Sequence, residues 1–117
     1  MEDSMNLRCT VEVVGDVATV TPVGDVAVES TPLLRDAIQA AMGQPDIAGV
    51  VVDLDGVTFL DSTALGMLVV ASRSCRERGV AFGVRDPGPM ATMVLRITGL
   101  FDELIAPRPE PPMWSLA

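Results

Sequence analysis

Histidine and lysine are both absent from this 117-residue chain, and only two cysteines are present. Without histidine, Ser-His-Asp and Cys-His catalysis are excluded, and most zinc sites with them. Without lysine, the chain has neither the phosphate-binding lysine of a Walker-type loop nor a Schiff-base nucleophile. Any functional site must therefore be built from carboxylates, hydroxyls and arginines.

Signals for export and for disulfide bonding are also missing. Cys9 and Cys75 are far apart and form no C-x-x-C pair, so we expect two free thiols. The opening residues, MEDSMNLR, lack the basic-then-apolar pattern of a signal peptide. No apolar run approaches the ~20 residues that span a bilayer. Because signals for export and for membrane insertion are missing, we expect a cytoplasmic protein. We also expect a single domain, because a chain of this length forms one core.

The charge is strongly one-sided. The net charge is −8, and all eight basic residues are arginines. Such an acidic chain is a poor match for the phosphates of nucleic acid or of an anionic membrane surface. We therefore expect neither as a partner.

The pattern of apolar residues predicts an α/β fold, a small mixed sheet covered by helices, in the order β-β-α-β-α-β-α. Ser30 or Thr31 and then Asp61 or Ser62 fit the N-cap position of a helix. The run IAGVVVDL is typical of a strand buried on both faces of a sheet. The strands are expected over 7–14, 17–23, 47–54 and 80–86, and the helices between Pro32 and Gly43, Ser62 and Gly79, and Pro89 and Gly99.

The C-terminal segment is of a different kind. The stretch FDELIA, at 101–106, fits a final short strand or a helical turn. The tail at 107–117, PRPEPPMWSLA, is rich in proline and is expected to be flexible. It contains Trp114, the only tryptophan of the chain. We therefore expect one domain at 7–106, followed by this tail.

Two neighbouring clusters compete as the functional centre. The first, in VVVDLDGVTF, resembles the nucleophile motif of the haloacid-dehalogenase phosphatases, in which Asp53 would attack phosphorus and Asp55 would act as general acid. The lysine and the second acidic pair of those enzymes have no counterpart downstream. We therefore prefer a structural role for both residues, at a strand end that turns through Gly56.

The second cluster, FLDSTALGMLV, resembles the signature of the STAS family, the domain of anti-sigma factor antagonists. The family pattern is roughly D-S-[ST]-G-L-x-x-L after a buried strand. The residues that match it are Asp61, Ser62, Thr63, Leu65, Gly66 and Leu68. The opening hairpin, GVVVDLDGVTFLDS, RERGVAFGV and VLRITGLFDEL also follow in the family's order, so the resemblance covers nearly the whole of 7–106.

This resemblance implies a partner-switching protein rather than an enzyme. The unphosphorylated domain would bind an anti-sigma factor, an ATP-binding serine kinase of histidine-kinase-like type, and so release a sigma factor. Phosphorylation at Ser62, with Thr63 as second choice, would end binding, and a serine phosphatase would restore it. No cofactor is expected on this chain. The expected partner surface is formed by Asp25, Asp61, Ser62, Thr63, Leu65 and Gly66.

The chain departs from the family pattern at two positions. Ala64 replaces the glycine after D-S-[ST], and alanine is a better helix former there. Ala27 stands where the family often has an acid, and Asp25 lies two residues earlier. The alternative from another functional class is a STAS scaffold subunit of a lipid-transport or stress-signalling complex that never uses Ser62 as a switch.

Overall fold

The structure is a mixed sheet with helices packed against one face. The computed structural model describes residues 7–100, 104 and 105. The elements are β1 (Leu7–Val14), β2 (Val17–Val26), α1 (Thr31–Met42), β3 (Gly49–Asp53), β4 (Val57–Leu60), α2 (Ser62–Glu77), β5 (Ala81–Arg85) and α3 (Gly88–Thr98). The expected α/β order is confirmed, with one addition, because β4 lies where only a connection was predicted.

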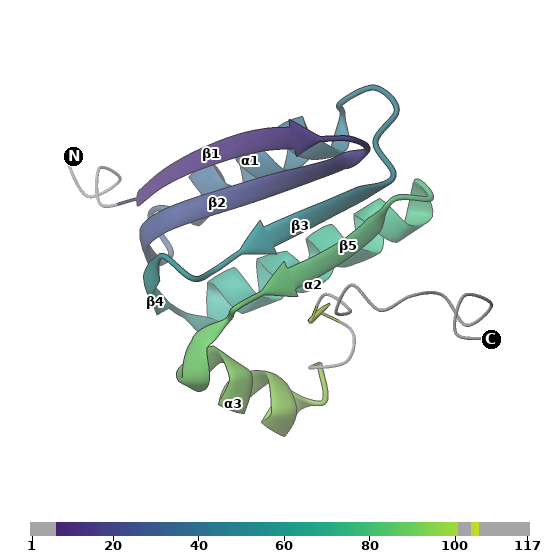
Figure 1. Ribbon diagram of the computed structural model, residues 1–117. Helices are drawn as coiled ribbons and strands as arrows, with labels where there is room; N and C mark the ends of the chain where they lie inside the picture. The colour runs from purple at the N-terminus through teal and green to yellow at the C-terminus, as the bar shows by residue number, and fades with distance from the viewer. Residues whose placement is uncertain (1–6, 101–103, 106–117) are drawn as a thin grey trace, which may run out of the picture.

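Strand β2 is the centre of the sheet. The strand order is β1-β2-β3-β5, and β4 also pairs with β2. Along one side, residues 17–24 of β2 pair antiparallel with the whole length of β1. Along the other side, its first half, 17–20, pairs in parallel with β3, and its end, 24–26, pairs in parallel with β4. One long strand therefore fixes the positions of three others (Figure 1).

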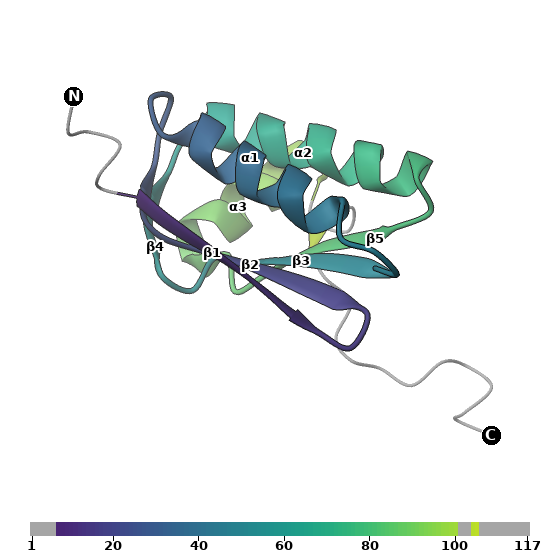
Figure 2. The same cartoon turned by 90° about the horizontal axis from the view of Figure 1, so that it is seen from above.

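The helices cover one face of the sheet only (Figure 2). The core lies between that face and helices α1 and α2. Its largest fully buried side chains include Leu34, Ile38, Leu68, Leu95, Val20, Val50, Val52 and Val84. The expectation that β3 is buried on both faces is wrong at Val51, which alternates to the uncovered face and is half-buried.

Short-range chemistry sets the helix boundaries. Helix α1 has Ser30 at its N-cap, but the Ser30 hydroxyl makes no capping hydrogen bond. It accepts from the Ala27 N–H at 3.0 Å and donates to the Asp25 carbonyl at 2.9 Å, which folds the preceding loop back on itself. The predicted stops at Gly79 and Gly99 are confirmed, since both residues adopt the left-handed backbone that favours glycine, with φ of 75° and 77°.

Both cysteines are free, and Cys75 is buried at the α1–α2 contact, where its Sγ lies 3.4 Å from Met42 Sδ. Burial raises the pKa of the Cys75 thiol, and Arg78 partly opposes that shift. Burial also raises the pKa of the half-buried Cys9. Both thiols are therefore disfavoured as thiolates.

The end of the chain is only partly described. Ile105 forms an isolated parallel bridge with Val84 of β5, and the rest of the predicted final element, 101–106, apart from Leu104, lies outside the described residues. The prediction of a flexible tail at 107–117 also falls outside them. Within the described ranges, every helix is too short or too polar to cross a membrane.

The packing predicts a large loss of stability when Leu68 is truncated. Its side chain is fully buried, so Leu68→Ala should lower the free energy of unfolding by about 2–5 kcal/mol. The matched control is Val70→Ala on the same helix, where the side chain is 63% exposed and the change should stay within about 0.5 kcal/mol. Urea unfolding followed by circular dichroism measures both. Equal losses would contradict the assigned helix orientation.

Candidate functional site

The start of α2 is fixed by Asp61. This N-cap residue has an extended backbone, and its Oδ1 accepts a hydrogen bond from the Ala64 N–H at 2.9 Å. Its carbonyl accepts from the Leu65 N–H at 3.1 Å, and its own N–H donates to the Val26 carbonyl at the end of β2 at 3.2 Å. Of the two residues predicted as possible N-caps, Asp61 and Ser62, Asp61 is therefore the N-cap.

Ser62 and Thr63 are the first two residues of the helix, and both are exposed. Among the described residues, the Ser62 hydroxyl has no hydrogen-bond partner, because the capping role belongs to its neighbour. Its position places it beside backbone N–H groups that have no intrahelical acceptor and at the positive end of the helix dipole. The hydroxyl is thus accessible and lies where a negative charge is tolerated.

In the next turn of α2, some side chains lie in the core and others at the surface. Ala64 is fully buried and Leu65 is 7% exposed, so these side chains support the helix start from within. Gly66 is exposed, and a Cβ placed there would have no atom within 4 Å apart from its two chain neighbours and the backbone of its own helix. Of the residues expected to form a partner surface, Leu65 therefore contributes packing, whereas Gly66 lies on the open side with Ser62 and Thr63.

Asp25 lies close to this helix start for a structural reason. Its carboxylate accepts a hydrogen bond from the Thr58 hydroxyl, and it is paired in register with Phe59. The loop after β2 is closed by Thr31, whose hydroxyl donates to the Ala27 carbonyl at 2.7 Å. Thr58 was not predicted as the partner of Asp25, because strand β4, which carries it, was not predicted.

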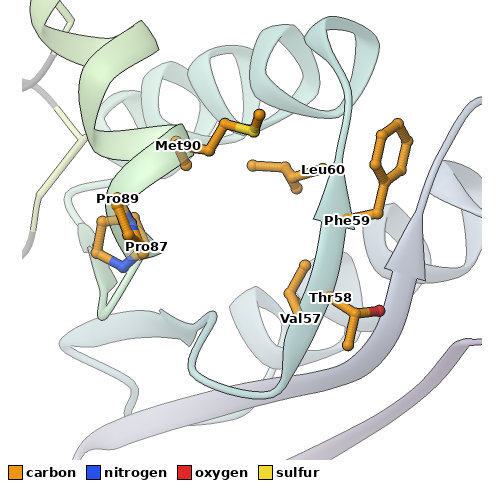
Figure 3. Close-up of a pocket in the computed structure, with 9 residues that line it drawn as sticks. Val57, Thr58, Phe59, Leu60, Pro87, Pro89 and Met90 are labelled. Atoms are coloured by element: carbon orange, nitrogen blue, oxygen red, sulfur yellow. The ribbon is translucent and has the colours of Figure 1, made fainter.

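An apolar cavity of about 200 Å³ adjoins the site between β4 and the start of α3. Val57 and Leu60 point from β4 toward this space, and Thr58 and Phe59 point to the other side of the strand (Figure 3). The opposite wall is formed by Pro87, Pro89 and Met90. Phe59 is 53% exposed and Met90 74% exposed, so apolar side chains border the polar start of α2.

The two acidic residues of the first cluster, Asp53 and Asp55, take part in local structure. Asp53 Oδ1 accepts from the Asp55 N–H at 3.0 Å, which turns the chain after β3. Asp53 Oδ2 lies 3.3 Å from Arg85 Nη2 on the adjacent strand β5. The described residues contain no group of three or more His, Cys, Asp or Glu side chains placed to hold a metal. The observed contacts match the structural role preferred for this pair.

Charge is distributed unevenly along α2. Its first turn adjoins the carboxylates of Asp61 and Asp25, whereas its last turns carry Arg73, Arg76 and Arg78. All three arginines are exposed, and Arg76 lies in the final turn, where a cation complements the helix dipole. The surface around Ser62 is therefore acidic, and the basic surface lies at the other end of the helix.

Comparison with known proteins agrees with this geometry. The sequence matches the STAS domain family over residues 8–112. It is similar to the crystal structure of an anti-sigma factor antagonist from Mycobacterium paratuberculosis, with 28% identity, a TM-score of 0.71, and coverage of 88% of this chain and 87% of that chain. A search of curated protein sequences finds no match.

More distant structures share the fold. The anti-sigma factor antagonist SpoIIAA in its unphosphorylated form is 17% identical, with a TM-score of 0.68 and coverage of 87% of this chain and 90% of that chain. The Bacillus cell fate determinant SpoIIAA in the phosphorylated form is 16% identical, with a TM-score of 0.67 and coverage of 94% and 100%.

The N-cap geometry predicts a specific effect at Asp61. Asp61→Ala removes the acceptor for the Ala64 N–H and should lower the free energy of unfolding by about 1 kcal/mol. Asp61→Asn keeps a side-chain oxygen at the same place and should retain most of that stability. Thermal and urea unfolding of the two variants test this. A loss as large for asparagine as for alanine would contradict the capping role.

Proposed function

Since the chain belongs to the STAS domain family, we propose that it acts as an anti-sigma factor antagonist. In this proposal the unphosphorylated protein binds an anti-sigma factor that is an ATP-binding serine kinase, and the sigma factor held by that kinase is released. The similarity to the Mycobacterium paratuberculosis antagonist supports it, because the alignment covers nearly all of both chains. The bound nucleotide and its metal would belong to the kinase.

The observation that carries the proposal is the exposed hydroxyl of Ser62 at the first position of α2. A kinase needs a reachable hydroxyl, and Asp61 has taken over the capping contact that would otherwise engage it. The existence of a phosphorylated form of SpoIIAA, which has the same fold, further supports a modified state.

Phosphorylation at Ser62 would change binding more than folding. A phosphoserine adds a charge of about −1.5 to −2 at pH 7, together with three acceptor oxygens. The N–H groups of the first helical turn can solvate that charge, so the domain can remain folded. A partner that covers Ser62 would have to strip water from the phosphate, and desolvation of a charge is expensive. Dissociation is therefore the expected outcome, and a serine phosphatase would reverse it.

The proposed contact surface is formed by exposed or half-buried groups around Ser62. Thr63 and Gly66 lie beside it on the helix, and Asp25 and Asp61 lie at the adjoining strand ends. Leu65 would act from the core by holding this turn in place.

The assignment of the modified residue is tested with the cognate kinase and ATP, followed by peptide mass mapping. Wild type and Thr63→Ala should each acquire one phosphate on Ser62, and Ser62→Ala should acquire none. Thr63→Ala is the matched control, because Thr63 is the neighbouring exposed hydroxyl. A wild-type protein that stays unmodified, or a phosphate that persists in Ser62→Ala, would refute the site.

The effect of charge on binding is tested by titration calorimetry with the same kinase. Ser62→Ala should bind as tightly as wild type, because it only removes a small hydroxyl. Ser62→Asp should bind at least about tenfold more weakly, a loss of about 1.4 kcal/mol, because a carboxylate must be desolvated. Equal affinity of Ser62→Asp and wild type would favour the scaffold alternative, in which Ser62 is no switch.

A further inference from the structure

Strand β1 is an open edge of the sheet. Among the described residues, no strand pairs with its outer side. Proteins usually protect such an edge with proline, a bulge or a very short strand, because its free N–H and C=O groups invite pairing. Strand β1 has eight residues and no proline, and its register with β2 is uninterrupted from Leu7–Gly24 to Val14–Val17. These three protections are absent, and of the charged side chains that also protect an edge β1 has two, Arg8 and Glu12.

The hairpin determines which backbone groups face outward. The two-residue turn at Gly15 and Asp16 is closed by the pair Val14–Val17, which is hydrogen-bonded in a tight hairpin. Bonded and non-bonded pairs alternate along an antiparallel ladder, so even-numbered residues of β1 bond to β2. The outward N–H and C=O groups belong to the odd-numbered residues, Leu7, Cys9, Val11 and Val13.

We propose that this edge pairs antiparallel with β1 of a second copy of the chain, with Thr10 opposite Thr10 on a two-fold axis. Only registers that place odd-numbered residues opposite odd-numbered residues align the outward N–H and C=O groups of the two strands. With Thr10 opposite Thr10, Leu7 of each copy faces Val13 of the other, and Cys9 of each copy faces Val11 of the other. These four pairs exchange about eight N–H···O=C hydrogen bonds. Such an arrangement is isologous and closes as a dimer.

Charge selects this register over its neighbours. Arg8 and Glu12 are exposed, on the face of β1 without helices, and neither has an ion-pair partner among the described residues. With Thr10 on the axis, Arg8 of each copy lies opposite Glu12 of the other, in the non-hydrogen-bonded positions where side chains approach most closely. A shift by two residues in either direction breaks both pairs. The edge is therefore complementary to itself.

The other face of β1 supplies apolar contacts. Leu7 is buried, but Val11 and Val13, which point to the same side, are 36% and 44% exposed. In the proposed register Val13 packs beside Leu7 of the second copy, and Val11 beside Cys9. The exposed end of each strand is thus covered by the buried end of the other.

Helix α1 extends this apolar contact. It packs over β1 and β2, and α2 lies on its far side (Figure 2). Its flank toward α2 carries Arg35, Gln39 and Met42. The opposite flank, toward the β1 edge, carries Leu33, Ala37 and Ala40, of which Leu33 is 40% exposed. Two copies of this uncharged, mostly small-residue flank would meet antiparallel across the axis.

The overall charge of −8 opposes association of two copies, but the proposed interface, formed by β1 and the facing flank of α1, carries no net charge. Each copy contributes one arginine and one glutamate from β1, and no charged residue from the facing flank of α1. Long-range repulsion is screened over about 8 Å at physiological ionic strength, whereas the cross-strand pairs act at contact distance. Dimerisation should therefore strengthen when salt is raised from low to physiological levels.

The interface is tested by sedimentation velocity over a concentration series of the full chain. Wild type should show a concentration-dependent dimer of the 12.3 kDa chain. Arg8→Glu alone and Glu12→Arg alone should each weaken the dimer at least about tenfold, because two favourable pairs become repulsive. An equimolar mixture of these two variants should recover the dimer, since it restores both opposite-charge pairs. Arg76→Glu, on the exposed end of α2, is the control and should dimerise like wild type.

The register is tested by disulfide trapping in a Cys9→Ser, Cys75→Ser background. Thr10→Cys places two thiols opposite each other on the axis, with Cα atoms about 4.5 Å apart, and mild oxidation should produce a covalent dimer. Glu12→Cys separates the two thiols by four residues along the strands, about 13 Å, and should not cross-link.

Three results would overturn the proposal. The first is a wild-type protein that remains monomeric up to about 1 mM. The second is a dimer that is insensitive to both charge reversals, which would place the contact on another surface. The third is equal cross-linking at positions 10 and 12, which would exclude the register. Each outcome is independent of phosphorylation at Ser62, so the proposed function stands or falls separately.

Discussion

Asp61 is the residue on which the geometry of the candidate site depends. Its backbone N–H bonds to Val26 at the end of β2, and its carboxylate bonds to the Ala64 N–H in the first turn of α2. These two contacts attach the helix start to the central strand of the sheet. Because Asp61 is the N-cap, Ser62 is the first residue of the helix proper, and its hydroxyl is not needed for the capping hydrogen bond. A serine at the cap itself would have used that hydroxyl to hold the helix.

The same arrangement leaves part of the helix N-terminus available for the proposed phosphate. Asp61 occupies the N–H of Ala64, and its carbonyl occupies that of Leu65. The N–H groups of Ser62 and Thr63 precede the first intrahelical bond, so they are the ones left to solvate a phosphate on Ser62. Phosphorylation therefore need not displace the cap. This is the physical reason why the proposed phosphate on Ser62 would alter the surface and leave the fold intact.

Interactions between neighbouring residues predicted most of the fold, and the two errors in strand assignment, the end of β2 and the absence of β4, have one origin. The hairpin, the helix stops at Gly79 and Gly99, and the helix that starts at DST follow from neighbouring residues. Strand β2 was expected to end at 23 because Gly24 and Asp25 interrupt its pattern. Instead the register shifts between these two residues, and the strand continues to Val26, where it pairs with β4.

That continuation depends on contacts between distant parts of the chain. Strand β4 has four residues, too few for a periodic signal, and its partner lies more than thirty residues earlier. The hydrogen bond from Thr58 to Asp25 follows from this pairing and was missed with it. By contrast, the role of Asp53 and Asp55 at a turn was predicted, since a D-x-D-G sequence after a strand carries its own turn signal.

The two proposed surfaces are compatible because β2 separates them. Strand β4, which leads into Ser62, pairs with β2 on the side away from β1. Leu7 and the start of β4 lie at the same end of the sheet, since Gly24 is in register with both Leu7 and Val57. In an antiparallel β1 pair, that end of one copy lies beside the hairpin end of the other. The two Ser62 surfaces would therefore lie at opposite ends of the dimer, and each could be covered or phosphorylated without obstructing the other.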